Sequence, residues 1–146
     1  MSKIMIAVDL SSYSTSVIAA GMQLARSTHS PVILTSILDK NTEVVPVIEA
    51  VGPSAEELNG RLKDIIAHLE NYKEQYPDVT VTVTATLGNP KEDILEQAAE
   101  ESATTLVIGT HGRTGLDHLL IGSTAEFVIR HSSIPVLVVP YRKEKH

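Results

Sequence analysis

The chain has 146 residues, of which 42% are hydrophobic and 21% charged, a composition that is typical of one globular domain and argues against a disordered or coiled-coil protein. It contains no cysteine, which excludes disulfides, thiolate metal sites and thiol nucleophiles and favours a reducing, cytoplasmic location. Twelve basic and eighteen acidic residues give a net charge of -6, and this acidic balance predicts no nucleic-acid partner.

The two ends of the chain show no sign of membrane insertion. The first apolar run, residues 4–8, is shorter than a secretory signal or a membrane span requires. The charged residues 141–146 are expected to form a flexible tail behind a single domain with its core at residues 3–140.

Five β-like segments alternate with four helix-like segments along the chain. We expect strands at residues 3–8, 32–37, 79–87, 105–109 and 135–139. The expected helices present the following apolar faces: Val17, Ile18, Leu24 and Ala25; Leu58, Leu62, Ile65, Ile66, Leu69, Tyr72 and Tyr76; Ile94, Leu95, Ala98 and Ala99; Ala125, Val128 and Ile129. The third helix starts with Asn89 as its N-cap and Pro90 at the first helical position. The alternation predicts an α/β fold, a single-domain doubly wound sheet of five parallel strands with four helices.

The strands differ in a way that predicts their order. Residues 79–87 alternate apolar residues with threonines and suit an edge, whereas the first, second and fourth strands are apolar throughout and suit the interior. A doubly wound order of 3-2-1-4-5 then places the last strand, Val136–Val139, on the opposite edge. Either helices alone flank this strand, or a second copy of the chain pairs with it, which is the reading we favour. Residues 38–53, the longest irregular stretch, are expected to form a mobile flap.

Four of the eight glycines fall between the fourth strand and the fourth helix, namely Gly109, Gly112, Gly115 and Gly122. In an open parallel sheet, ligands bind at this carboxyl end of the strands, and glycines let backbone N–H groups approach an anion closely. Ser123 and Thr124 add hydroxyl donors, and Arg113 adds a planar cation. The window therefore indicates a phosphate site, although a glycine-rich surface loop with an N-cap at Ser123 explains the same residues.

Asp9 ends the first strand and should face the same crevice from the other side. Its carboxylate would bind a nucleoside or join a magnesium shell, or it would cap the following helix. His111 and His118 are the only histidines near the crevice and have no third ligand beside them, so we expect no metal site built from protein alone. The Walker loop and the dinucleotide fingerprint are both absent from the sequence, and no catalytic triad can be assembled.

Two motifs together resemble those of a known family. The spacing of Gly109, Gly112 and Gly122, followed by Ser123 and Thr124, resembles the ATP-binding signature of the universal stress proteins. The segment from Asp9 through Leu10 and Ser11 to Ser14 resembles the aspartate–serine segment of that family, as do the start of the third helix and the last strand. The resemblance covers residues 3–140.

The resemblance implies a fold, a ligand and an assembly. It implies the layering of the adenine nucleotide hydrolase-like and flavodoxin-like folds, and a homodimer through Val136–Val139. It implies bound ATP. A magnesium ion held through the ATP phosphates near Asp9 is a further expectation, from the Asp9 carboxylate. The implied binding residues are Asp9 and Ile37 for the adenosine, with Gly109, Gly112, Arg113, Gly122, Ser123 and Thr124 for the phosphates. Leu10 departs from the glycine of many relatives and would narrow the crevice.

The functional expectation is a cytoplasmic ATP-binding regulatory protein of the stress response, a switch or sensor with slow or no ATP hydrolysis. No residue is assigned a catalytic role. Two alternatives remain open: a docking module for a transporter or kinase that uses the fold without nucleotide, and an enzyme that processes an adenylated or phosphorylated substrate.

Overall fold

The computed structural model describes residues 2–43, 54–110 and 121–140 of the chain. In chain order its elements are β1 (Ile4–Ala7), α1 (Ser14–Thr28), β2 (Val32–Asp39), α2 (Lys40–Glu43), α3 (Ala55–Glu74), β3 (Val81–Gly88), α4 (Pro90–Glu100), β4 (Thr105–Gly109), α5 (Ser123–His131) and β5 (Val136–Val139). All five expected strands are present. The four expected helices are α1, α3, α4 and α5, and the four-residue α2 is additional.

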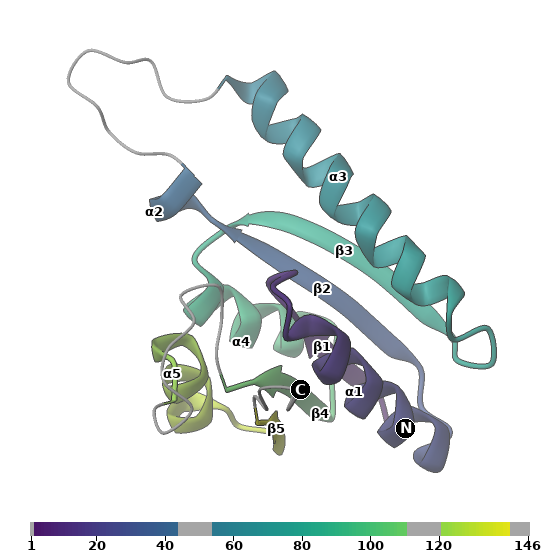
Figure 1. Ribbon diagram of the computed structural model, residues 1–146. Helices are drawn as coiled ribbons and strands as arrows, with labels where there is room; N and C mark the ends of the chain where they lie inside the picture. Colours follow the sequence, from purple (N-terminus) through teal and green to yellow (C-terminus); the bar gives the residue numbers. More distant parts are fainter. Residues whose placement is uncertain (1, 44–53, 111–120, 141–146) are drawn as a thin grey trace, which may run out of the picture.

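The five strands form one parallel sheet in the order β3-β2-β1-β4-β5 (Figure 1). Ile4 in the central strand pairs with Val32 of β2 on one side and with Thr105 of β4 on the other. The chain therefore turns outward in both directions from β1, and the predicted α/β doubly wound fold is confirmed. The reversal of strand order between β1 and β4 is the point at which open α/β sheets leave a crevice.

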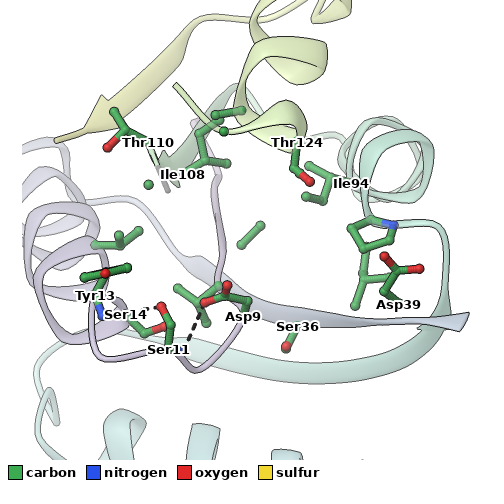
Figure 2. Close-up of a pocket in the computed structure, with 18 of the residues that line it drawn as sticks. Asp9, Ser11, Tyr13, Ser14, Ser36, Asp39, Ile94, Ile108, Thr110 and Thr124 are labelled. Atoms are coloured by element: carbon green, nitrogen blue, oxygen red, sulfur yellow. Dashed lines mark hydrogen bonds between the residues drawn. The ribbon is translucent and has the colours of Figure 1, made fainter. Parts of the chain in front are cut away.

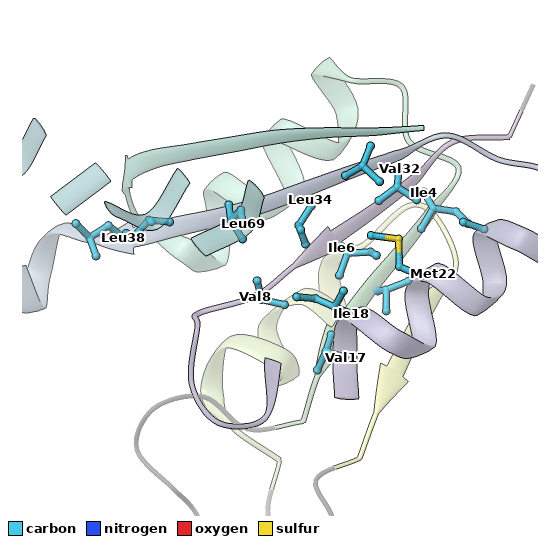
Figure 3. Close-up of a cluster of buried hydrophobic side chains, with 14 residues drawn as sticks. Ile4, Ile6, Val8, Val17, Ile18, Met22, Val32, Leu34, Leu38 and Leu69 are labelled. Atoms are coloured by element: carbon cyan, nitrogen blue, oxygen red, sulfur yellow. The ribbon is translucent and has the colours of Figure 1, made fainter. Parts of the chain in front are cut away.

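Two buried clusters fix the layers on either side of the sheet. Alternate residues of β1 point to opposite faces, so Ile4 and Ile6 join one cluster while Met5 joins the other. On the first face, α1 and α3 pack onto the sheet through residues such as Ile18 and Leu69 (Figure 3). On the second face, α4 and α5 pack through Ile94, Ala98, Ala125 and Val128.

A closed ring of three side chains ties α4 to the edge of the sheet. The Thr84 hydroxyl donates to Thr35 Oγ1 at 2.8 Å, and the Thr35 hydroxyl donates to Gln97 Oε1 at 2.9 Å. Gln97 Nε2 completes the ring by donating to Thr84 Oγ1 at 2.8 Å. Because Thr35 is fully buried, these bonds satisfy polar groups that water does not reach.

Some predicted burial is wrong at the helix edges. Ala99, Ile66 and Ile129 are exposed, because each lies one position beyond the stripe that faces the sheet. Conversely, Met22 was missed and is fully buried in α1. The apolar pattern locates each helix correctly but not the width of its buried face.

The second strand is longer than expected. It continues through Asp39 and leads directly into α2. Residues 38–43, the first part of the stretch that was expected to be irregular, therefore belong to a strand and a short helix. The remainder of the proposed flap, residues 44–53, and the proposed flexible tail, residues 141–146, lie outside the described residues. Within the described ranges, no helix is both long and apolar enough to cross a membrane.

Candidate functional site

A cleft of about 300 Å³ opens at the carboxyl end of the sheet, where β1 and β4 diverge (Figure 2). The loop after β1 and the start of α1 form one wall, and the end of β4 with the start of α5 forms the opposite wall. The end of β2 and the first turn of α4 close the third side. A cleft of this size is at the small end of the range for ligand pockets.

A tight turn shapes the wall that follows β1. Asp9 Oδ1 accepts a hydrogen bond from the Ser11 N–H at 3.0 Å, and Ser11 Oγ accepts one from the Tyr13 N–H at 3.3 Å. The Ser14 N–H donates to the Ser11 carbonyl at 3.1 Å and leads into α1. Asp9 therefore stabilises the turn while its carboxylate also lines the cleft.

Leu10 makes this turn with a backbone φ of 61°, in the left-handed region that favours glycine. Its side chain packs, half-buried, against the hydrophobic cluster under α1 and α3 and is not among the residues that line the cleft. The expectation that Leu10 narrows the crevice is therefore wrong, since its bulk points into the core.

The opposite wall is the start of α5. Gly122 is the N-cap, with φ -63° and ψ 157°, and its N–H donates to the Thr110 carbonyl at 2.7 Å. The first intrahelical bond runs from the Glu126 N–H to the Gly122 carbonyl at 3.0 Å. The backbone N–H groups of Ser123, Thr124 and Ala125 precede that bond and have no partner within the helix.

The N-cap of α5 is not the residue that the surface-loop interpretation expects. Ser123 is the first residue of the helix and not its N-cap, and Gly122 supplies no side chain to cover the amide groups. Ser123 and Thr124 line the cleft together with Gly122. An uncapped helix start that opens into a cleft is an arrangement that suits an anion.

The third side contains residues that the sequence reasoning missed. Ser36, Asp39, Pro90 and Ile94 line the cleft beside the expected Ile37. Asp39 Oδ1 accepts a hydrogen bond from the Asn41 N–H at 2.9 Å and so caps the start of α2. Their positions are the signal that could have found them: Ser36 and Asp39 belong to the last half of β2, and Pro90 and Ile94 belong to α4, which directly follows β3 at the same edge of the parallel sheet.

The charges of the cleft come from its acids. Asp9 and Asp39 are the carboxylates among the described lining residues, and these residues include no lysine or arginine. The described part of the chain also holds no cluster of three or more metal-ligating side chains. Any attraction for an anion on these walls therefore comes from backbone N–H groups and the dipole of α5.

The cleft brings most of the expected site residues together. Asp9, Ile37, Gly109, Gly122, Ser123 and Thr124 all line it, from four different elements or turns. Gly112 and Arg113, which were expected to contact phosphate, lie outside the described residues, as do His111 and His118.

One polar group in the cleft is left unsatisfied. The Ser14 hydroxyl lines the wall beside Asp9 and Ser11, yet it is buried and finds no hydrogen-bond partner among the described residues (Figure 2). A buried hydroxyl without a partner is unusual and calls for an explanation.

Comparison with known proteins identifies relatives over the length of the chain. The family model described as the Universal stress protein family matches residues 1–140. The universal stress protein MJ0577 of Methanocaldococcus jannaschii is 34% identical over 99 residues, which cover 63% of this chain and 61% of that protein. The match to a second relative from the same organism, MJ0531, spans 34% of that protein's length.

Solved structures share the fold. The structure of MJ0577 has a TM-score of 0.76 and 27% identity, with 99% of each chain covered. A universal stress protein in complex with cAMP has a TM-score of 0.70 and 19% identity, covering 95% of this chain and 96% of its own. One from Archaeoglobus fulgidus in complex with dAMP has a TM-score of 0.62 and 21% identity, covering 95% and 98%.

Proposed function

The chain belongs to the universal stress protein family, and on that premise we propose that it is a regulatory protein that binds ATP in the cleft between β1 and β4. The observation that carries the proposal is the start of α5, where uncapped backbone N–H groups open into the cleft opposite Asp9. Relatives of the same fold have been solved with cAMP and with dAMP, which supports an adenine nucleotide as the class of ligand.

The start of α5 would hold the phosphates. The N–H groups of Ser123, Thr124 and Ala125 lie ahead of the first intrahelical bond, and the helix dipole adds positive potential there. The Thr124 hydroxyl projects into the cleft as a further donor (Figure 2). Gly112 and Arg113, from the same glycine window, are proposed to complete the phosphate site.

The adenosine would lie toward the ends of β1 and β2. Ile37 is almost fully buried and lines the cleft at the end of β2. Asp9 supplies a carboxylate that accepts hydrogen bonds from a ribose hydroxyl or an exocyclic amine. This end of the site distinguishes bases, so we expect ATP to bind in preference to GTP.

The residues fit magnesium only together with the nucleotide. Asp9 is one hard oxygen ligand, and Mg²⁺ usually combines one or two carboxylates with phosphate oxygens and water. Magnesium would neutralise phosphate charge near Asp9. Because the described lining contains no lysine or arginine, only backbone N–H groups would otherwise neutralise that charge there.

We expect ATP hydrolysis to be slow or absent. Fast hydrolysis requires a base that orients water, and the two carboxylates among the described lining residues already accept backbone hydrogen bonds. A site that binds the ground state and the transition state equally accelerates little. We therefore propose that the protein is a switch or sensor of the stress response. We also propose a cytoplasmic location, because a protein without cysteine forms no disulfides and so needs no oxidising compartment.

The edge strand β5 is the proposed dimer interface. Val136 and Val138 pack toward the cluster beneath α4 and α5, while Leu137 on the other face is 38% exposed. A hydrophobic edge strand is a template for pairing with another chain unless something covers it. Pairing with the same strand of a second copy would close as a symmetric dimer.

Titration calorimetry with ATP and GTP tests the binding proposal. Gly122→Val places a side chain on the wall where phosphate would approach, and we expect ATP binding to be lost. Gly60→Val is the matched control, because Gly60 is exposed in α3 and a Cβ there meets no atom within 4 Å. Equal affinities for the wild type and Gly122→Val, or no ATP binding by the wild type, would overturn the site.

A further inference from the structure

Ser14 lines the cleft with a buried hydroxyl whose hydrogen bonding the fold alone does not explain. Ser14 is the first residue of α1 and is 2% exposed. Its Oγ has no hydrogen-bond partner among the described residues, whereas other hydroxyls of the same helix do. Thr15 Oγ1 lies 3.0 Å from the Tyr72 hydroxyl, and Thr28 donates to the Leu24 carbonyl at 2.8 Å.

The surrounding turn uses its other polar groups internally. The Ser14 N–H donates to the Ser11 carbonyl, and the Ser11 hydroxyl accepts from the Tyr13 N–H. Asp9 accepts from the Ser11 N–H through Oδ1. Ser14 Oγ is thus a buried side-chain group on this wall for which the described residues offer no partner, and Ser14 lines the cleft beside Asp9 and Ser11 (Figure 2).

The dipole of α1 favours an anion as the partner of Ser14, and it acts there against the negative charge of the nearby Asp9 carboxylate. The first turn of α1 contains no acidic residue, and the N-cap Tyr13 makes no side-chain cap to the first-turn amide groups. The positive end of this helix dipole is therefore uncompensated by its own first turn. Across the cleft lies the start of α5, so two helix N-termini from opposite faces of the sheet flank the same space.

We infer that Ser14 is a second phosphate-binding element, whose hydroxyl donates a hydrogen bond to a phosphoryl oxygen of the bound nucleotide. This inference rests on the proposed nucleotide binding and adds to it a contact from α1, on the wall opposite the glycine window. The N-termini of α1 and α5 would then stabilise the anion from opposite sides of the cleft through their helix dipoles. A ligand that lacks phosphate gains nothing from Ser14.

The same geometry predicts opposite effects of one substitution on stability and on binding. In the free protein, Ser14→Ala removes a buried hydroxyl that has no partner among the described residues, so the variant should melt higher by about 2–4 °C. In the complex, the substitution removes a hydrogen bond to a charged oxygen. We expect the Kd for ATP to rise about tenfold, which corresponds to about 1.4 kcal/mol.

The experiment combines thermal melts without ligand and titration calorimetry with ATP and with adenosine. The proteins are the full-length wild type, Ser14→Ala and, as a matched control, Ser16→Ala, whose exposed hydroxyl lies two residues further along the same helix and outside the cleft. The inference expects Ser14→Ala to weaken ATP alone, leaving adenosine unchanged, and expects Ser16→Ala to match the wild type for both ligands.

The contrary outcomes are distinct. Unchanged ATP affinity in Ser14→Ala would overturn the inference while leaving the proposed function intact. An equal loss for adenosine would place the hydroxyl against the nucleoside and also overturn it. A lower melting temperature for ligand-free Ser14→Ala would contradict the unsatisfied state of the hydroxyl. Failure of the wild type to bind either ligand would instead refute the proposed function, and this inference with it.

Discussion

The backbone conformation of Leu10 predicts which of two substitutions, Leu10→Gly or Leu10→Ala, leaves the protein more stable. Leu10 holds φ at 61°, and a side chain in this left-handed region costs about 1–2 kcal/mol because Cβ approaches the following carbonyl oxygen. Glycine has no such cost. In an ordinary conformation the preference is reversed, and glycine is less favourable than alanine by about 0.5–1 kcal/mol.

The comparison of Leu10→Gly with Leu10→Ala isolates the backbone term. Both variants lose the half-buried leucine side chain beyond Cβ, whose packing contributes about 1 kcal/mol if half of a fully buried leucine is counted. Leu10→Ala keeps the backbone strain and should be destabilised by about that amount. Leu10→Gly relieves the strain and should be more stable than Leu10→Ala by about 0.5–1 kcal/mol.

Equilibrium urea unfolding of the two variants and the wild type measures these differences. Ala67→Gly, at an exposed position in the interior of α3, is the control for glycine in an ordinary conformation and should lose about 1 kcal/mol. If Leu10→Gly were less stable than Leu10→Ala, by an amount similar to the control, the positive φ at this turn would be refuted.

Three further outcomes follow from particular contacts. Gln97→Leu breaks the ring with buried Thr35 and half-buried Thr84 and should lower the free energy of unfolding by about 1–3 kcal/mol, whereas replacing both threonines by valine as well should restore most of it; urea unfolding checks both. The Arg26 side chain hydrogen-bonds to Asp78 and lowers its pKa, so this pair stabilises the fold above the ordinary aspartate pKa and loses that contribution as the pH falls through the lowered value. An NMR carboxyl titration should show the Asp78 pKa rising in Arg26→Gln, and an unchanged pKa would count against the pair. Leu137→Lys on the exposed face of β5 should convert the proposed dimer to monomer in light scattering, and a persistent dimer would argue against pairing through this strand.

Part of the strand order was predictable because the burial of a strand leaves a mark on its sequence. The alternating threonines of β3 indicated an edge and the continuous apolar residues of β1, β2 and β4 indicated the interior, whereas the edge position of β5 was inferred from the doubly wound order. The start of α4 was also readable, since Asn89 accepts from the Lys91 N–H and Pro90 occupies the first turn, as predicted.

What the sequence could not reveal depends on conformation and on three-dimensional neighbours. Leucine rarely adopts positive φ, so no propensity points to the turn at Leu10. The hydrogen bonds of Gln97 reach 62 and 13 residues away, and a polar residue on a helix is otherwise read as exposed. Likewise, serine is common at helix starts, and only its burial without a partner distinguishes Ser14.

The central claim is that an adenine nucleotide binds between the start of α5 and the turn after β1. Titration calorimetry of ATP against the wild type, Gly122→Val and Gly60→Val tests it most directly. The account predicts saturable binding of about one ATP per chain by the wild type and Gly60→Val, with binding lost in a folded Gly122→Val. ATP binding of equal strength in all three proteins, or in none of them, would contradict it.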